Sequence, residues 1–357
     1  MADQETCYPL TSLYLYLTDR CNLSCSHCWI SPEFSQLRQN GIPLDSLKKT
    51  ISEAGALGLG SVKLTGGEPL LYRQLDELLI FLKSKELTIY IETNGTLIDQ
   101  KMIKSFQAAG VEQISVSLDA ATEEIHNKIR GIKGSYALTM QGLHRLSGSG
   151  LQFQIIMTLQ RKNRGEIPAM ILLSKKLGAC SLKINHLLPC GRGKDVFDQK
   201  ENLDLDELTQ LYRLVEEEWP RPDTIEIEFD LPVALRSIED IKRRGLNECR
   251  ILNILGILAN GDFSICGIGQ TVEELRMGNL LHDSVTEVWH NNPILIELRQ
   301  SITSRLKGAC GGCIFKFQCL GGCRANAYFL TKDLHAPYFL CQQYYESGLF
   351  PSSRYIG

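Results

Sequence analysis

Short apolar segments alternate with helical segments between residues 12 and 188, and this alternation restricts the chain to a parallel α/β fold. The repeat of about 30 residues is the length that a strand–helix–strand unit requires. Gly58, Gly110 and Gly178 follow three of the helical segments, where a helix end favours a residue with positive φ. The predicted strands cover residues 12–18, 61–65, 88–94, 113–119, 151–158 and 181–188. The predicted helices cover residues 44–57, 75–85, 99–109, 136–147 and 166–177.

Each predicted strand has one apolar and one polar or mixed face. In the first strand, three leucines alternate with Tyr14, Tyr16 and Thr18. A parallel sheet with helices on both faces would be apolar on both faces. The pattern therefore predicts a curled, partly open barrel with a polar lumen and an active site at the carboxyl ends of its strands. Lys63 and Glu92 lie on the lumen face of adjacent strands, so we expect them to pair with each other, with a catalytic role as the alternative.

Composition restricts the partners and the compartment. The chain has 357 residues, 43% hydrophobic and 22% charged, as in ordinary soluble globular proteins. A net charge of −3 gives no reason to expect nucleic acid or an anionic membrane as a partner. The N-terminal segment has no basic region and its apolar run is too short to span a bilayer, so we expect a cytoplasmic protein. Its thirteen cysteines are then more consistent with metal ligands than with disulfides, although we expect Cys7 and Cys180 to be structural.

A group of three cysteines follows the first strand. Cys21, Cys25 and Cys28 have the spacing C-x3-C-x2-C. Three thiolates can hold three irons of a [4Fe–4S] cluster and leave the fourth iron open. Zinc would need a fourth ligand nearby. His27 is the only local candidate, and its position between two of the thiols would strain such a site.

Further motifs follow the second and third strands. The second strand is followed by Gly66, Gly67, Glu68 and Pro69, and the third ends in Asn94. The two glycines allow the backbone to approach a ligand closely, and Glu68 offers an acceptor for an ammonium group. A plain turn between a strand and a helix is the alternative interpretation.

The order of these motifs resembles that of the radical S-adenosylmethionine (SAM) enzymes. The resemblance implies that the three-cysteine cluster binds SAM and that residues 66–69 hold its amino group, with Asn94 in the same cofactor site. Ser117 and Asp119, two positions apart on a strand, point to the same side. The resemblance implies that both contact the ribose, with a turn-forming aspartate as the alternative. It also implies that Arg130 lies near the SAM carboxylate.

The sixth strand leads into Pro189-Cys190-Gly191-Arg192. The pattern P-x-G-R is similar to one found at this point in radical SAM enzymes. Cys190 could donate a hydrogen atom or a proton at the mouth of the barrel. The alternative is a small buried residue, since free cysteine is among the most buried residue types.

The C-terminal part of the chain contains seven more cysteines. Asn260-Gly261 between two apolar runs predicts a β-hairpin that brings Cys249 and Cys266 together. A glycine-rich segment follows, and a zinc ribbon would explain one C-x2-C pair but not this whole series. The remaining cysteines of the series are Cys310, Cys313, Cys319, Cys323 and Cys341.

This series resembles the SPASM domain of radical SAM peptide maturases. The resemblance implies two auxiliary Fe–S clusters, both expected to be [4Fe–4S]. One would be held by Cys310, Cys313, Cys319 and Cys341. The other would be held by Cys249, Cys266 and Cys323, which leaves an open iron or a ligand other than cysteine.

The predicted fold class is therefore α/β, a partial (β/α)6 radical SAM barrel followed by a small SPASM domain with a β-hairpin. We expect the barrel at residues 10–195, a helical bridging region without chemistry at 196–245, the SPASM domain at 246–345 and a tail at 346–357.

The resemblance implies an oxidoreductase. One electron passes from the first cluster to SAM, the resulting 5′-deoxyadenosyl radical abstracts a hydrogen atom, and the auxiliary clusters accept the product electron or bind the substrate. The expected substrate is a peptide or small protein that gains a thioether, carbon–carbon or carbon–oxygen cross-link. We expect a flavodoxin- or ferredoxin-type reductant. A separate protein could recognise the leader peptide, because only about ten residues precede the first strand.

Alternative functions remain open at this stage. The chain could be a formylglycine-forming sulfatase maturase or a radical SAM enzyme that modifies tetrapyrroles or heme. A non-catalytic electron-transfer protein would not need the SAM motifs, and a hydride-transfer enzyme is disfavoured because no G-x-G-x-x-G follows a strand. About twelve irons per chain would indicate two auxiliary clusters, and about eight would favour a single one.

Overall fold

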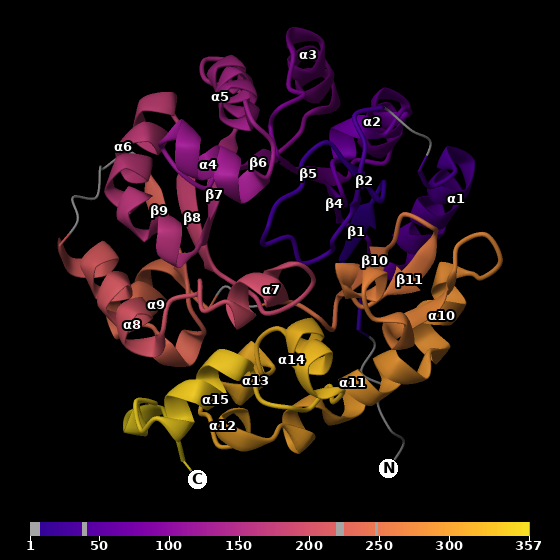
Figure 1. The fold of residues 1–357 in the computed structure, drawn as a ribbon. Helices are drawn as coiled ribbons and strands as arrows, with labels where there is room; N and C mark the ends of the chain where they lie inside the picture. The colour runs from indigo at the N-terminus through magenta and orange to yellow at the C-terminus, as the bar shows by residue number, and fades with distance from the viewer. Residues whose placement is uncertain (1–7, 38–40, 219–224, 247–248, 357) are drawn as a thin grey trace.

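The computed structural model describes residues 8–37, 41–218, 225–246 and 249–356. Cys7 lies outside the described residues. The main sheet has ten strands in the order β12-β11-β10-β1-β4-β5-β6-β7-β8-β9, and helices surround it (Figure 1). A small second sheet pairs β2 (Arg20–Cys21) with β3 (Glu33–Phe34). No helix in the described part of the chain is long and apolar enough to cross a membrane.

All six predicted strands and all five predicted helices are present, with small differences at their ends. The strands are β1 (Ser12–Tyr16), β4 (Ser61–Thr65), β5 (Thr88–Thr93), β6 (Gln113–Ser117), β7 (Phe153–Leu159) and β8 (Ser181–His186). The helices are α1 (Leu44–Ala54), α2 (Leu75–Ser84), α3 (Gln100–Ala109), α5 (Ser135–Leu146) and α6 (Ile167–Leu177). Neighbouring strands from β1 to β8 pair in parallel, and the predicted α/β class is confirmed. The helix α4 (Glu123–Arg130) was not predicted.

The sheet does not end at the sixth predicted strand. Strand β9 (Glu226–Asp230) pairs in parallel with β8, and β10 (Ile254–Ile257) pairs in parallel with β1. The region 196–245 is therefore not wholly helical, because it supplies β9 as well as α7 (Gly193–Asp198, in part), α8 (Leu205–Arg213) and α9 (Ile238–Arg244). The domain boundaries near residues 195 and 245 stay a prediction, since the sheet continues across both.

The predicted hairpin is confirmed. Strand β10 turns at Asn260-Gly261 into the antiparallel β11 (Asp262–Ser264), which pairs with β12 (Arg276–Asn279). Gly261 has a φ of 89°, as such a turn requires. The helices that follow form the lower part of Figure 1. They are α10 (Val285–Asn291), α11 (Pro293–Arg305), α12 (Gly308–Gly311), α13 (Lys316–Cys319), α14 (Arg324–Thr331) and α15 (Phe339–Glu346).

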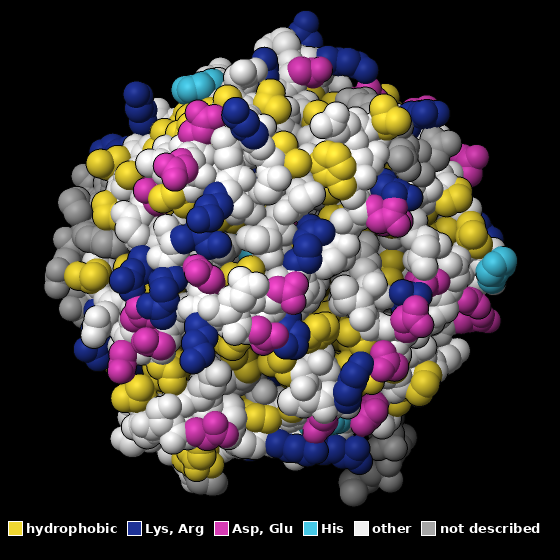
Figure 2. Space-filling model, in the orientation of Figure 1, with side chains coloured by type: hydrophobic (Ala, Val, Ile, Leu, Met, Phe, Trp, Pro, Cys, Tyr) yellow, Lys and Arg dark blue, Asp and Glu magenta, His cyan; other side chains and the backbone are white. Residues whose placement is uncertain are grey.

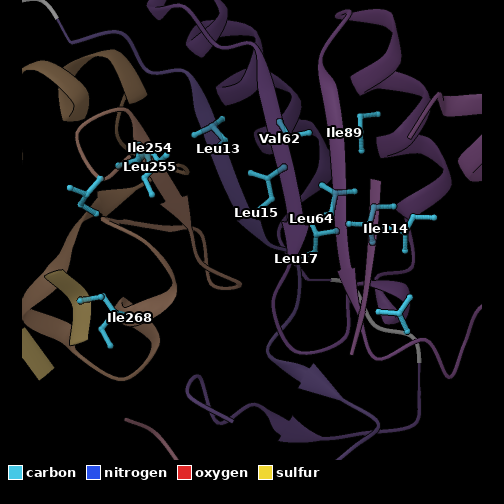
Figure 3. Packing of buried hydrophobic residues seen from close by; sticks show 14 of the residues in the cluster. Leu13, Leu15, Leu17, Val62, Leu64, Ile89, Ile114, Ile254, Leu255 and Ile268 are labelled. Carbon is cyan, nitrogen blue, oxygen red and sulfur yellow. The ribbon is translucent and has the colours of Figure 1, made fainter. Parts of the chain in front are cut away.

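The apolar faces of the strands form the core beneath the helices, as predicted. Leu13 and Leu15 of β1, Val62 and Leu64 of β4 and Ile114 of β6 are fully buried (Figure 3). The opposite face of these strands carries polar or mixed side chains, of which Tyr14, Lys63 and Ser117 are half-buried and Tyr16, Thr65 and Ser115 are buried. On the outer face shown in Figure 2, Lys and Arg side chains are interspersed with Asp and Glu side chains, in agreement with the small net charge.

We predict that Leu64→Ala lowers the free energy of unfolding by about 3 kcal/mol, because it removes a fully buried side chain from a packed core. Urea unfolding of the metal-free protein measures this value. Leu138→Ala on α5 is the matched control, since Leu138 is 46% exposed and its loss leaves no cavity. Equal unfolding midpoints for the two variants would contradict the packing described above.

Candidate active site and iron–sulfur sites

The three cysteines after β1 lie together in one loop. Cys21 and Cys25 are each 7% exposed, and Cys28 is half-buried. Burial raises the pKa of the Cys21 thiol, and the neighbouring Glu68, Cys25 and Cys28 raise it further. The backbone N–H of Leu23 donates to Cys21 Sγ at 3.4 Å. No three His, Cys, Asp or Glu side chains in the described ranges are arranged to hold a single metal ion. Three thiols from one loop are the donor set of a cluster in which each thiolate binds a different iron.

His27 is turned away from a shared metal site. Its Nδ1 lies 3.3 Å from Gln160 Nε2, and its Nε2 lies 3.9 Å from Asp119 Oδ2. Burial lowers the pKa of His27 to about 4, although Asp119 partly opposes the shift. A zinc site that uses His27 together with the three thiols has no support in this arrangement.

The two glycines after β4 allow the backbone to pair with the start of the cysteine loop. Gly67 N donates to Thr18 O, and Glu68 N donates to Arg20 O, both at 2.8 Å. A Cβ atom at Gly67 would lie 2.0 Å from Arg20 O, and Gly66 has a φ of 121°. Glycine is therefore required at both positions by a close approach of protein backbone.

Glu68 does not present its carboxylate to the lumen. It is 0% exposed and accepts hydrogen bonds from Thr93 Oγ1 at 2.7 Å, Asn94 N at 2.8 Å and Leu70 N at 3.1 Å. Burial raises the pKa of Glu68 to about 7, and these hydrogen bonds oppose the shift. The side chain thus joins the ends of β4 and β5, and its contact with an ammonium group stays a prediction. Pro69 follows it in a buried 3-10 turn, Pro69–Leu71.

Asn94 holds the cysteine loop from the end of β5. Its Nδ2 donates to Asn22 Oδ1 at 2.8 Å and lies 3.9 Å from Cys21 Sγ. Its Oδ1 accepts from Thr96 Oγ1, which in turn accepts from Asn22 Nδ2 at 2.8 Å. Asn94 thus contacts the loop that was expected to carry the cluster.

The expected ribose contacts, Ser117 and Asp119, differ in their surroundings. Strand β6 ends at Ser117, and Asp119 lies two residues beyond it. Ser117 is half-buried, whereas Asp119 is 0% exposed. Asp119 Oδ1 accepts from Thr158 N at 2.9 Å, and Oδ2 lies 2.7 Å from Arg130 Nε. The ribose contact expected of Asp119 stays a prediction, and its carboxylate lies beside Thr158 N and Arg130.

Arg130 lies between Asp119 and the cysteine loop. Its Nη1 donates to Cys25 Sγ at 3.6 Å. Burial alone would raise the pKa of Asp119, but the guanidinium holds that pKa below its usual value. The same guanidinium lowers the pKa of the Cys25 thiol against the larger effect of burial. Arg130 therefore favours negative charge on both neighbours.

Lys63 and Glu92 pair with each other in the lumen, as expected. Lys63 Nζ lies 2.9 Å from Glu92 Oε1 and 4.6 Å from the centre of the Tyr14 ring. Thr65 Oγ1 donates to Glu92 Oε2 at 3.2 Å. Burial opposes ionisation of Glu92, but Lys63 holds its pKa below the usual value.

Four C-terminal cysteines surround one small, mainly apolar pocket. The pocket is also lined by Ala309, Lys316 and Phe350. Each of the four cysteines is between 5% and 8% exposed. A hydrogen bond from Cys341 lowers the pKa of one of them, Cys310, to about 7. Tyr338 N also donates to Cys310 Sγ, at 3.4 Å. The four cysteines are Cys310, Cys313, Cys319 and Cys341.

A larger cavity of about 900 Å³ lies beside the other C-terminal cysteines. Its lining includes Cys249 and Cys323, together with charged residues such as Lys183 of β8 and Glu228 of β9. Other lining residues come from the segment that leads into β10. The cavity is therefore bordered by β9 and by the segment before β10, which lie at opposite ends of the parallel part of the sheet. Cys190 is not among the described residues that line it, and it is 1% exposed.

Comparison with known proteins identifies the family to which the chain belongs. Residues 15–173 match the family model of the radical SAM superfamily, and residues 249–314 match that of SPASM, an iron-sulfur cluster-binding domain. An AdoMet-dependent heme synthase of Methanosarcina barkeri is 30% identical over 89% of this chain and 92% of its own length. The chain belongs to the radical SAM superfamily.

The similar proteins also include maturases. The mycofactocin maturase MftC of Mycobacterium ulcerans is 29% identical over 95% of this chain and 89% of its own length. Among solved structures, Streptococcus suis SuiB bound to precursor peptide SuiA gives a TM-score of 0.72 at 19% identity, over 94% of this chain and 76% of SuiB. Native anSMEcpe with bound AdoMet gives a TM-score of 0.70 at 18% identity, over 95% of each chain. At these identities the two structures support the fold.

The radical SAM assignment determines the cofactors. The chain is an enzyme that binds a [4Fe–4S] cluster and SAM through its radical SAM domain and auxiliary Fe–S clusters through its SPASM domain. The SPASM match ends at residue 314, so Cys319, Cys323 and Cys341 lie beyond it.

Arg192 is a residue of this radical SAM enzyme whose role was missed from the sequence. Its backbone N–H donates to Cys28 O at 2.9 Å, and its Nε donates to Cys25 O at 2.9 Å. Its Nη1 also reaches Pro32 O at 3.3 Å. The P-x-G-R pattern contained this signal, but only Cys190 was considered as a functional residue within it.

We predict that Arg192→Ala loosens the cysteine loop and lowers the free energy of unfolding by about 2 kcal/mol, because hydrogen bonds from a charged group are lost. Iron release to a chelator from the reconstituted protein should be faster than in the parent. Lys194→Ala is the control, since the Lys194 side chain is half exposed and forms an ion pair with Asp198. Release at the parental rate in Arg192→Ala would show that the loop does not depend on this side chain.

Proposed function

We propose that Cys21, Cys25 and Cys28 hold the [4Fe–4S] cluster that binds SAM. The observation that carries this proposal is the cluster of three buried or half-buried thiols in a loop fixed by hydrogen bonds from three strand ends, without a metal-ligating side chain from His27. When bound, SAM and the cluster supply a radical that abstracts a hydrogen atom from a substrate. The protein positions the loop and excludes water from it.

The protein residues around this loop have separate roles in the proposal. The backbone of Gly66 and Gly67 lies against the loop and remains the proposed contact for the amino group of SAM. Asn94 and Glu68 position the loop and the strand ends. Ser117, which is half-buried, remains a candidate for the ribose contact. Asp119 also remains a candidate for the ribose contact. Arg130, which provides positive charge beside Cys25, remains the proposed neighbour of the SAM carboxylate.

The SPASM cysteines are proposed to hold two auxiliary clusters. The small pocket lined by Cys310, Cys313, Cys319 and Cys341 carries the first assignment, because it gathers four thiols and little else that could bind a metal. Cys249, Cys266 and Cys323 are proposed for the second. Such clusters can accept an electron from a substrate radical, which suits a net oxidation.

A peptide is the proposed substrate, oxidised to a thioether or to a carbon–carbon or carbon–oxygen cross-link. The cavity of about 900 Å³ supports this choice, since it is large, carries both charge signs and lies beside proposed cluster ligands. Maturases among the relatives, such as MftC, and the SuiB complex with a precursor peptide also favour it. A separate leader-binding protein, a flavodoxin- or ferredoxin-type reductant and a cytoplasmic location complete the proposal.

A tetrapyrrole is the second candidate substrate. It is favoured by one specific observation, the 30% identity to an AdoMet-dependent heme synthase over nearly the whole chain. The reduced, reconstituted enzyme can be incubated with SAM and either iron-coproporphyrin III or a pool of synthetic peptides. Mass spectrometry then distinguishes decarboxylation of the porphyrin from loss of two hydrogen atoms from a peptide. Porphyrin turnover without peptide turnover would replace the first proposal by the second.

We predict that Cys21→Ala abolishes the cleavage of SAM, because two thiolates cannot hold the cluster that SAM binds. Chromatography of 5′-deoxyadenosine after reduction with dithionite provides the measurement. Cys180→Ala should cleave SAM at the parental rate, since Cys180 is a half-buried cysteine outside all three proposed cluster sites. Continued 5′-deoxyadenosine formation by Cys21→Ala would refute the ligand assignment.

We predict that Cys313→Ala retains some SAM cleavage but loses conversion of whichever substrate class is turned over. The reason is that the variant lacks a ligand of the proposed auxiliary cluster while the SAM site is intact. Measuring 5′-deoxyadenosine and product in the same reaction separates the two effects. Full product formation in this variant would exclude a redox role for that cluster.

A further inference from the structure

The thiol of Cys190 is placed next to the incomplete SPASM set. Cys190 follows β8 in the barrel and is far in sequence from Cys249, Cys266 and Cys323. It is 1% exposed and does not line the large cavity among the described residues, so a direct role on a substrate there is disfavoured. Its surroundings instead point to the C-terminal cysteines.

Asn326 joins Cys190 to Cys323. It lies in the first turn of α14, is 1% exposed, and its backbone N–H donates to Cys323 Sγ at 3.4 Å. Its side-chain Nδ2 donates to Cys190 Sγ at 3.5 Å. Two sulfur atoms from distant parts of the chain therefore contact nitrogen atoms of the same buried residue.

The other two SPASM cysteines belong to the same neighbourhood. The 3-10 turn Gly267–Gln270, which follows Cys266 directly, packs against α14. Cys249 and Cys323 line the same cavity, where Cys323 is half-buried and Cys249 is exposed. Asn326 Oδ1 is buried there without a hydrogen-bond partner among the described residues.

We propose that Cys190 is the fourth ligand of the auxiliary cluster that Cys249, Cys266 and Cys323 hold. Four thiolates are the usual ligand set of a [4Fe–4S] cluster. This inference rests on the proposed function, since it assumes that the three SPASM cysteines bind a cluster. It replaces the open iron, or ligand other than cysteine, that was expected from the sequence.

Oxygen donors that line the same cavity are weaker candidates for this position. The Asp230 side chain is 48% exposed, and its Oδ2 lies 3.9 Å from His186 Nδ1. The Tyr14 ring lies beneath Lys63, and Tyr338 Oη pairs with His186 Nε2 at 2.6 Å. Thiolate is the softer donor and suits an Fe–S cluster better than carboxylate or phenolate.

A complete ligand set determines how the cluster can be used. Without an open iron, the cluster accepts electrons but does not bind a substrate atom. The loop that carries Cys190 also packs on the SAM-cluster loop, because Arg192 N donates to Cys28 O at 2.9 Å. A Cβ atom at Gly191 would lie 2.3 Å from Trp29 O, which shows how closely the two loops approach. One short segment would thus contact both cluster sites.

The test uses the full chain with Cys21, Cys25 and Cys28 replaced by alanine, so that the open iron of the SAM cluster is absent. The reconstituted, dithionite-reduced protein is examined by electron paramagnetic resonance with and without cyanide, a ligand for an open iron. We expect no cyanide effect in this parent protein. A cyanide-induced change in the parent would overturn the proposal without any substitution at Cys190.

Cys190→Ser in the same background should shift one auxiliary signal and make it sensitive to cyanide, or lower the iron content by about four per chain. Cys180→Ser is the matched control and should behave like the parent. Thermal melting of the metal-free variants establishes that Cys190→Ser is folded. Parental spectra, cyanide insensitivity and iron content in Cys190→Ser would overturn the proposal. The experiment needs no substrate, so parental behaviour of Cys190→Ser would not affect the proposed reaction. Absence of iron from all the proteins would instead count against the proposed function itself.

Discussion

The position of the cysteine loop depends on a backbone contact that only glycine permits. Gly67 lies so close to Arg20 O that a methyl group would overlap the carbonyl, and the adjacent N–H groups hydrogen-bond to the carbonyl oxygens of Thr18 and Arg20. The segment after β4 thereby sets the path of the chain after β1. Side chains at the ends of β5 and β8 then add further hydrogen bonds to the same loop. The loop is thus constrained by several parallel strands before any cofactor binds.

Buried charge supports this arrangement. Asp119 is fully buried and lies beside Arg130, His27 and the backbone N–H of Thr158. An isolated carboxylate at this depth would be costly, and the guanidinium of Arg130 offsets that cost while it also contacts Cys25. Lys63 and Glu92 form a second pair on the wall of the lumen. These two pairs place opposite charges beside each other at positions where an isolated charge would be costly.

Much of the fold follows from local sequence patterns, but the direction of several site residues does not. Strand and helix positions from β1 to β8 follow from apolar alternation and from glycines at helix ends. Strand β9 was missed because acidic residues alternate with only Ile227 and Phe229 in a short segment. Cysteine spacing identified the cluster motifs, whereas the orientation of Glu68 and Asp119 depends on where neighbouring strands end. The contact between Cys190 and Asn326 joins residues 136 positions apart, so no local pattern could have predicted it.

The pairing of β10 with β1 has a consequence for how the enzyme is divided. Ser12 to Leu15 lie in parallel register with Ile254 to Ile257, so the first strand of the barrel is a central strand only while the C-terminal region is present. Without that region, β1 would become an edge with unpaired N–H and C=O groups, which is a template for aggregation. The barrel and the SPASM region therefore share one hydrogen-bonded sheet. A cut between them would leave two open strand edges, one on each half, rather than two closed domains.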